Sequence, residues 1–210
     1  MPKRIPHTDF EVITGTKTTR DYLAMQKKLG KFYFKGFFSK LDKLDKGKRF
    51  LEVGPGPGYQ SALVAEKYRP DEIIGLEYSE DMIRVAESYV QENKLGEVVK
   101  FKNGPVEDRE RIAGLGKFDF VYSTFSLHHW TDPVAGIKNL YDALNPGGTF
   151  FIYDFFRGGL FYYLKIKRGI WESIRAAYTP DEIKQMMAGL GIDTYRIDMK
   201  YPYMAITIQK

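Results

Sequence analysis

The chain of 210 residues contains no cysteine, and this absence excludes several kinds of chemistry. Disulfides, a thiolate nucleophile and cysteine-based zinc sites are all ruled out. Histidine is scarce as well, with three residues in the chain. Two of them, His128 and His129, are adjacent, so their side chains would usually diverge, and no ligand-like spacing of acids surrounds them. We therefore expect no metal site.

No hydrophobic run in the sequence approaches the roughly 18 to 20 residues that span a bilayer. Residues 1–8 also lack the apolar segment of a signal peptide. We therefore expect a cytoplasmic protein without a transmembrane segment. The length of 210 residues and the 43% share of hydrophobic residues fit a single α/β domain with its own core. We divide the chain into a helical extension or lid over residues 1–47 and one domain over residues 48–210.

Basic residues outnumber acidic ones by 32 to 27, which gives a net charge of +5. They gather in residues 27–49 and 165–175, and three interpretations of these segments are open. The segments could bind RNA, could be attracted to anionic lipid, or could be the solvated faces of amphipathic helices. Leucine and phenylalanine are interleaved with lysine in the first segment, which favours a solvated face.

Hydrophobic periodicity predicts a regular alternation of strands and helices after residue 48. We expect strands near residues 49–54, 72–77, 97–102, 117–123 and 147–154, with helices near 59–68, 80–93, 107–113 and 133–144. One or two helices precede them within residues 18–45, and a helix over 179–190 leads to a closing strand pair near 195–198 and 204–208. Asp81 and Thr131 or Asp132 are the expected helix caps. Such an alternation makes a parallel sheet with right-handed crossovers.

A strand that ends in a glycine-rich turn lies between Arg49 and Tyr59. Gly54, Gly56 and Gly58 lack a Cβ, so a ligand can approach the backbone closely. The helix that follows offers unpaired N–H groups and the positive end of its dipole. About twenty residues later a second strand ends at Glu77, where a ribose diol would lie if the two strands are parallel neighbours. The two features together indicate a nucleotide-containing cofactor.

The spacing of these glycines separates two classes of cofactor. A dinucleotide site is typically G-x-G-x-x-G, whereas this chain has G-x-G-x-G, with Tyr59 at the place of the last glycine. S-adenosylmethionine has no phosphate, and its site needs room for a methionine tail and an acid for the ribose. Glu52 and the glycines could serve the tail, and Glu77 could serve the ribose. The spacing favours S-adenosylmethionine.

Two further motifs follow in the expected order. Residues 118–133 read FDFVYSTFSLHHWTDP, and residues 144–154 read LNPGGTFFIYD. With the glycine turn and Glu77, residues 48–155 resemble the class I S-adenosylmethionine-dependent methyltransferases, in the branch of the ubiquinone/menaquinone methyltransferases and many small-molecule enzymes. The resemblance implies a Rossmann-like α/β fold: a seven-stranded, mostly parallel sheet with an antiparallel closing strand, helices on both faces and the N-terminal helical extension.

The resemblance also implies where S-adenosylmethionine binds. The turn over residues 52–58 would surround the methionine part, Glu77 would hold both ribose hydroxyls, and Tyr78 and Met82 would flank the adenine. The family usually has an aspartate for the adenine amino group where this chain has Pro105, so Glu107 or the Val106 backbone would take that role. The full expected set is Glu52, Gly54, Gly56, Gly58, Glu77, Tyr78, Met82, Val106, Glu107 and Thr124.

His128 and His129 are the candidate catalytic residues. They follow the fourth expected strand, at the edge of the sheet where ligands bind, and histidine titrates near neutral pH. Either one could deprotonate an acceptor that is protonated at working pH. The alternative is that the pair fixes its loop through hydrogen bonds to the backbone. Asp154 and Arg157 are further candidates for the pocket, or else a surface pair.

Aromatic residues are concentrated in residues 155–171, within a lid-like insertion near 155–178. They would give an apolar wall for a flat or lipid-like acceptor, or they simply pack a helix onto the sheet. Tyr22, Tyr33 and Phe34 present the same choice between lid and core. We predict methyl transfer to a small or amphiphilic acceptor. The alternatives are an RNA or protein methyltransferase, whose basic segments would converge beside the pocket, a catalytically inactive S-adenosylmethionine-binding module, and a dinucleotide enzyme.

Overall fold

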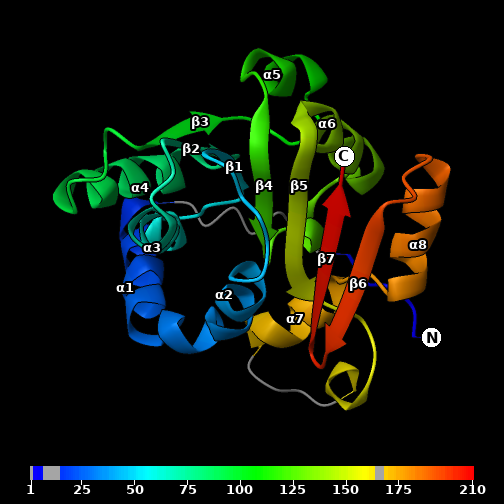
Figure 1. The fold of residues 1–210 in the computed structure, drawn as a ribbon. Coiled ribbons are helices and arrows are strands. Elements are labelled where there is room, and N and C mark those ends of the chain that lie inside the picture. Colours follow the sequence, from blue (N-terminus) through cyan, green and yellow to red (C-terminus); the bar gives the residue numbers. More distant parts are fainter. Residues whose placement is uncertain (1, 7–14, 164–167) are drawn as a thin grey trace.

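The computed structural model describes residues 2–6, 15–163 and 168–210, and its strands form one seven-stranded sheet (Figure 1). The strand order is β3-β2-β1-β4-β5-β7-β6. The strands are β1 (Arg49–Val53), β2 (Glu72–Glu77), β3 (Val99–Asn103), β4 (Phe118–Thr124), β5 (Leu144–Phe155), β6 (Tyr195–Lys200) and β7 (Tyr203–Gln209). β7 runs antiparallel to both of its neighbours, and the other pairs are parallel. The expected fold class is confirmed.

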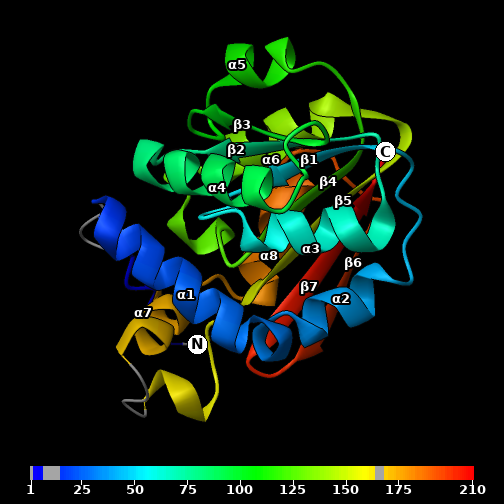
Figure 2. The same ribbon diagram turned by 90° about the vertical axis from the view of Figure 1, so that its left-hand side faces the viewer.

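Helices cover both faces of this sheet because its strands are apolar on both sides. Alternate residues of β1 point to opposite faces, so Phe50 joins one core cluster and Leu51 joins the other. The first face carries α2 (Lys35–Leu41), α3 (Tyr59–Tyr68) and α4 (Glu80–Glu92), and the second carries α5 (Arg109–Gly114), α6 (Pro133–Ala143) and α8 (Pro180–Gly189). Two further helices are α1 (Thr16–Tyr33) and α7 (Arg168–Ala176). Figure 2 shows α1 running beside α4 towards α2.

The elements expected from the sequence lie within a few residues of the observed ones. The structure adds α7 and two short 3-10 turns, η1 (Leu127–His129) and η2 (Leu160–Tyr162). Asp132 caps α6 as expected, through the Ala135 N–H. The cap of α4 is Ser79 rather than Asp81, because its hydroxyl accepts from the Met82 N–H at 3.3 Å. Asp81 instead accepts from the Gly15 N–H at 2.8 Å, just before α1.

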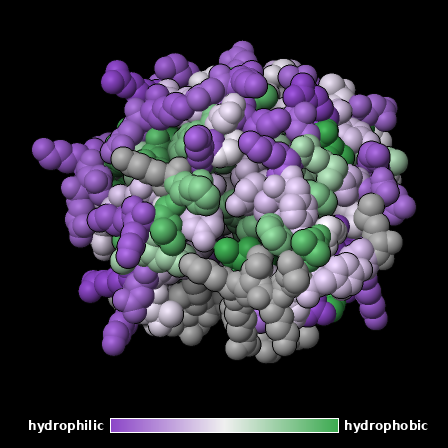
Figure 3. All heavy atoms as spheres, turned by 90° about the horizontal axis from the view of Figure 1, so that it is seen from below, coloured by the Kyte–Doolittle hydropathy of each residue, from purple (hydrophilic) through white to green (hydrophobic). Residues whose placement is uncertain are grey.

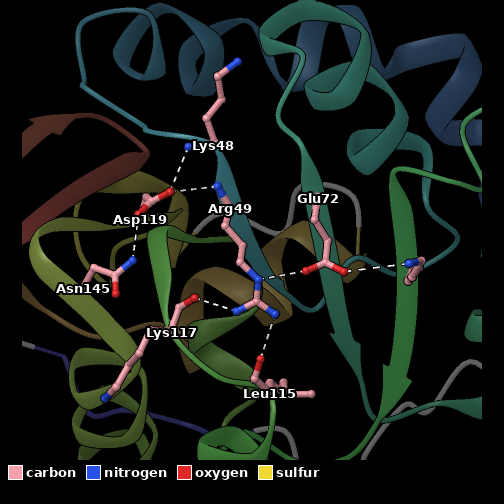
Figure 4. Close-up of polar contacts among 8 residues, drawn as sticks. Lys48, Arg49, Glu72, Leu115, Lys117, Asp119 and Asn145 are labelled. Carbon is pink, nitrogen blue, oxygen red and sulfur yellow. Dashed lines mark hydrogen bonds and ion pairs between the residues drawn. The ribbon is translucent and has the colours of Figure 1, made fainter.

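Polar groups at the amino ends of the central strands pair with one another (Figure 4). Asp119 accepts from the backbone N–H groups of Lys48 and Arg49, at 2.9 and 3.0 Å, and from the Asn145 amide at 2.8 Å. These hydrogen bonds hold the pKa of Asp119 below its usual value. The Arg49 guanidinium donates to Glu72 at 2.8 Å and to the carbonyls of Leu115 and Lys117. At this edge of the sheet, the polar groups therefore form hydrogen bonds with one another.

None of the helices in the described ranges is long and apolar enough to cross a membrane.

Candidate active site

A cavity of about 490 Å³ opens at the opposite edge, around the carboxyl ends of the parallel strands. Figure 3 looks onto the molecule from this side and shows hydrophobic residues gathered near the middle, with hydrophilic residues around much of the rim. Eight residues expected at the site line the cavity: Gly54, Gly56, Glu77, Tyr78, Met82, Val106, Glu107 and His129. The other four expected residues, Glu52, Gly58, Thr124 and His128, lie outside its lining.

The glycine turn has a backbone that side chains would strain. Gly54 and Gly56 have φ values of 73° and 56°, in the left-handed region. A Cβ on Gly54 would also lie 2.5 Å from the Ser126 hydroxyl oxygen. Gly58 serves another purpose, because it precedes α3 and a Cβ there would lie 2.9 Å from Ala86 Cβ. The first two glycines thus open the cavity, and the third lets α3 pack against α4.

Glu77 ends β2 with its carboxylate fixed by the backbone. One oxygen accepts from the Gly56 N–H and the other from the Ser79 N–H, both at 3.0 Å. Burial raises the pKa of Glu77 more than these hydrogen bonds lower it. Each carboxylate oxygen has two lone pairs, so both can accept a further hydrogen bond from a ligand in the cavity. Glu77 is therefore an oriented acceptor at the wall.

Glu52 and Thr124 lie within the fold behind the cavity wall. The Glu52 carboxyl is buried beside the hydroxyls of Ser61 and Tyr122, and burial raises its pKa to about 7. The Thr124 hydroxyl accepts from the Gln60 amide at 2.7 Å. A direct role for either residue in cofactor binding stays a prediction, because neither side chain lines the cavity.

The expected adenine end of the cavity is formed by the segment after β3. Gly104, Pro105, Val106 and Glu107 all line it, as do Tyr78 and Met82 after the neighbouring strand β2. The Glu107 carboxylate accepts from the backbone N–H groups of Thr131 and Asp132, at 2.9 and 3.1 Å. It therefore ties this segment to the loop after β4 while it still faces the cavity. An adenine contact by Glu107 or by the Val106 backbone stays a prediction.

The two histidines have different places in the structure. His128 is buried, and its Nδ1 lies 2.7 Å from an Asp154 oxygen while its backbone N–H donates to the other oxygen at 3.1 Å. The carboxylate favours the tautomer with the proton on Nδ1. His129 lines the cavity, and its ring centroid lies 4.1 Å from that of His128. Asp154, His128 and His129 thus form a row that ends at the cavity.

Comparison with known proteins identifies this architecture. Residues 51–152 match a family model described as a methyltransferase domain. The chain is 31% identical over 105 residues to an uncharacterized methyltransferase, YdaC, of Bacillus subtilis, and 31% identical over 110 residues to a demethylmenaquinone methyltransferase of Geobacillus. Residues 51–152 are a class I methyltransferase domain.

The matches with these relatives are partial. Each covers 50% of this chain, and the chain spans 55% of the Bacillus protein and 44% of the Geobacillus protein. A solved S-adenosylmethionine-dependent methyltransferase from Aquifex aeolicus has the same fold over more of the chain. Its TM-score is 0.70 at 15% identity, covering 93% of this chain and 98% of that one. The methyltransferase fold therefore extends beyond the matched domain to both sides.

None of the described residues of the aromatic insertion lines the cavity. Phe125 lines the cavity and stacks on Phe155 with ring centroids 4.9 Å apart. Phe155 in turn packs with Ile174 of α7. Arg157 is buried and pairs with Glu182, so it forms a structural ion pair within the fold. Residues 164–167 of the insertion lie outside the described residues, and its role as a lid stays a prediction.

The cofactor-binding and catalytic residues expected from the sequence left out several residues that line the cavity. They are Tyr22, Val53, Leu76, Ser79, Gly104, Pro105, Phe125, Ser126, Trp130 and Thr131. Most of them occupy strand ends or the residues just after β2, β3 and β4, a position that would have identified them. Tyr22, for which the sequence left lid and core open, lies on α1, outside residues 51–152, and lines the cavity.

Proposed function

We propose that this chain binds S-adenosylmethionine in the cavity and transfers the methyl group to a small, uncharged acceptor. The observation that carries the proposal is the convergence of three expected parts on one cavity. The glycine turn, the Glu77 carboxylate and the segment after β3 are far apart in the sequence, yet all three line it. The methyltransferase match over residues 51–152 supports the same donor.

The residues present fit the donor. Both Glu77 oxygens keep a lone pair for a ribose hydroxyl, as a diol requires. Gly54 and Gly56 leave space where any side chain would project, and Leu76, Met82 and Val106 give apolar contacts. Bound S-adenosylmethionine supplies an electrophilic methyl group on a positively charged sulfur. The protein then needs mainly to align the acceptor and exclude water.

The lining of the cavity favours an uncharged acceptor. Among the residues whose side chains the structure describes, no lysine or arginine lines it, whereas Glu77 and Glu107 do. A phosphate or carboxylate on the acceptor would meet these acids without a compensating cation. Phe125 and Trp130 offer aromatic surfaces instead. A nucleic acid acceptor is disfavoured by the same lining, and the name of the Geobacillus relative supports a small molecule.

We assign His129 as the group that takes a proton from the acceptor, and His128 as a positioning residue. His129 lines the cavity, whereas His128 is held by Asp154 behind it. If the acceptor is a hydroxyl, its O–H proton passes to the imidazole as the new O–CH₃ bond forms and the S–CH₃ bond breaks. The Asp154–His128 pair keeps the neighbouring ring in one orientation.

Calorimetric titration with S-adenosylmethionine, S-adenosylhomocysteine and NADH tests the donor. Micromolar binding of the first two, with no binding of NADH, is the expected result. Transfer of radiolabelled methyl to quinols, phenols, lipids and RNA then tests the acceptor, and labelling of the uncharged small molecules is expected. Labelling of RNA alone would overturn the acceptor assignment. Tight donor binding without transfer to any of these acceptors would favour a binding module.

A further inference from the structure

Helix α1 contributes one residue to the cavity, although it lies outside the matched domain. Tyr22 lines the cavity together with Gly54, Gly56 and Glu77. A Cβ placed on Gly56 would lie 3.9 Å from Tyr22 Cε1, so the phenol ring faces the glycine turn across a gap about one methyl group wide. The side of the cavity that the parallel strands leave open is thus covered here by an aromatic ring.

The helix that carries Tyr22 is held at both ends. The Gly15 N–H donates to Asp81 at 2.8 Å and ties the start of α1 to α4. Near the other end, Gly30 packs so closely against α3 that a Cβ there would lie 2.3 Å from Tyr59 Cε1. Two contacts to helices of the sheet's first face therefore fix the position of α1 over the turn.

Tyr22 and the next residue of α1, Leu23, have different surroundings. Leu23 packs against the cluster of Phe34, Tyr59, Ala62 and Tyr89, where α1 meets α3 and α4. Tyr22, one residue earlier, points instead to the cavity. Burial, together with the nearby Glu77 carboxylate, raises the pKa of Tyr22, so its hydroxyl stays neutral beside that acid.

We propose that Tyr22 is a cofactor-binding residue and that α1 is the outer wall of the cofactor site. The phenol ring covers the ligand between the glycine turn and Glu77, and it excludes water from that part of the cavity. This inference rests on the proposed function, because it names a further contact for the same cofactor. It assigns part of the binding energy to a helix that the family match does not include.

Three variants of the full chain test the proposal by calorimetric titration with S-adenosylhomocysteine. Tyr22→Ala should weaken binding by about tenfold or more, which corresponds to the loss of one well-packed ring contact. Tyr22→Phe keeps the ring and should bind within about threefold of the unsubstituted chain. Met25→Ala is the matched control, because Met25 is an exposed apolar residue of the same helix outside the cavity, and its affinity should be unchanged.

Hydrogen exchange of the α1 amides gives a readout that needs no acceptor. S-adenosylhomocysteine should slow exchange across residues 16–33 in the unsubstituted chain and in Tyr22→Phe, but much less in Tyr22→Ala. Equal affinity of Tyr22→Ala and the unsubstituted chain would overturn the inference, as would unaltered α1 exchange on binding. If the unsubstituted chain itself bound no S-adenosylhomocysteine, the proposed function would fail, which is a separate result. Circular dichroism melting confirms that each variant is folded.

Discussion

The two ends of strand β2 carry the same residue in opposite surroundings. Glu72, at the amino end, pairs with the Arg49 guanidinium at 2.8 Å (Figure 4). The Glu72 carboxylate also lies 3.9 Å from the Lys100 ammonium. Glu77, at the carboxyl end, is held by two backbone N–H groups and faces the cavity. The fold satisfies the first carboxylate with its own cations, whereas it orients the second one and leaves it able to bind a ligand.

The acid groups at the two edges of the sheet differ in the direction of their pKa shifts as well. Hydrogen bonds from Lys48 and Arg49 lower the pKa of Asp119 at the amino edge. Burial raises the pKa of Glu77, and raises that of Glu52 to about 7, towards the carboxyl edge. The comparison teaches that the acids at the amino edge are paired within the fold, whereas those towards the carboxyl edge are buried at or behind the cavity wall.

Glu77→Ala should have the largest effect on binding. In the proposed binding mode it removes two charge-assisted hydrogen bonds to the ribose, each worth about 1.5 to 3 kcal/mol, so affinity for S-adenosylhomocysteine should fall by about 100-fold or more. Glu72→Ala on the same strand is the control, and it should lower thermal stability while leaving the affinity unchanged. If Glu77→Ala and Glu72→Ala bound S-adenosylhomocysteine with similar affinity, Glu77 would have no special role in binding at the carboxyl end of β2.

His129→Gln should reduce turnover with little change in donor binding. Loss of a general base costs about 100-fold or more in kcat, and the acidic limb of the pH–rate profile should change with it. The affinity for S-adenosylhomocysteine, measured by calorimetry, should stay within about twofold. A loss below about tenfold in kcat for both His129→Gln and His128→Ala would assign the pair to holding the loop.

Glu52→Gln should change how stability depends on pH. Because the folded-state pKa of Glu52 is raised to about 7, the folded protein binds more protons than the unfolded chain between about pH 4.3 and pH 7. The free energy of unfolding of the unsubstituted chain should therefore fall as the pH rises through that window, and this group contributes about 3 kcal/mol of the fall. Urea unfolding at pH 5 and pH 8 measures the fall. Glu52→Gln has no carboxyl to titrate at this position, so its stability should fall by that much less between pH 5 and pH 8.

Asp119→Asn should have the smallest effect, and one of opposite sign with pH. A lowered folded-state pKa gives stability that is complete above the unfolded value of about 3.9 and is lost as pH falls through the folded value. Between pH 5 and pH 2.5, the free energy of unfolding should fall more steeply with decreasing pH for the unsubstituted chain than for Asp119→Asn. Equal slopes would show that Asp119 is not held in its charged form.

The order of elements and much of the cavity could be predicted from local sequence patterns. Glycine and proline mark the turns, and hydrophobic periodicity marks the strands, so the strand ends that carry Gly54, Glu77 and Val106 could be located. Alternation along β1 also predicts that Glu52 and Val53 point to opposite faces, and Val53 is the one that lines the cavity. The Glu52 side chain lies outside the cavity lining, and its contact with the cofactor stays a prediction.

The remaining parts depend on contacts between distant segments. The partnership of His128 with Asp154 joins residues 26 positions apart across neighbouring strand ends. The orientation of Tyr22 depends on how α1 docks on α3 and α4, through Gly30 and Asp81, which no local pattern encodes. The aromatic insertion is similar, because rings suited to a pocket wall and rings suited to a core have the same composition.

A crystal structure of the chain grown with S-adenosylhomocysteine tests the central claim most directly. The account predicts that the ligand lies in the cavity with both ribose hydroxyls within hydrogen-bond distance of the Glu77 carboxylate and with the adenine between Met82 and Val106. Ligand density elsewhere on the molecule, or in the cavity with the ribose turned away from Glu77, would contradict it.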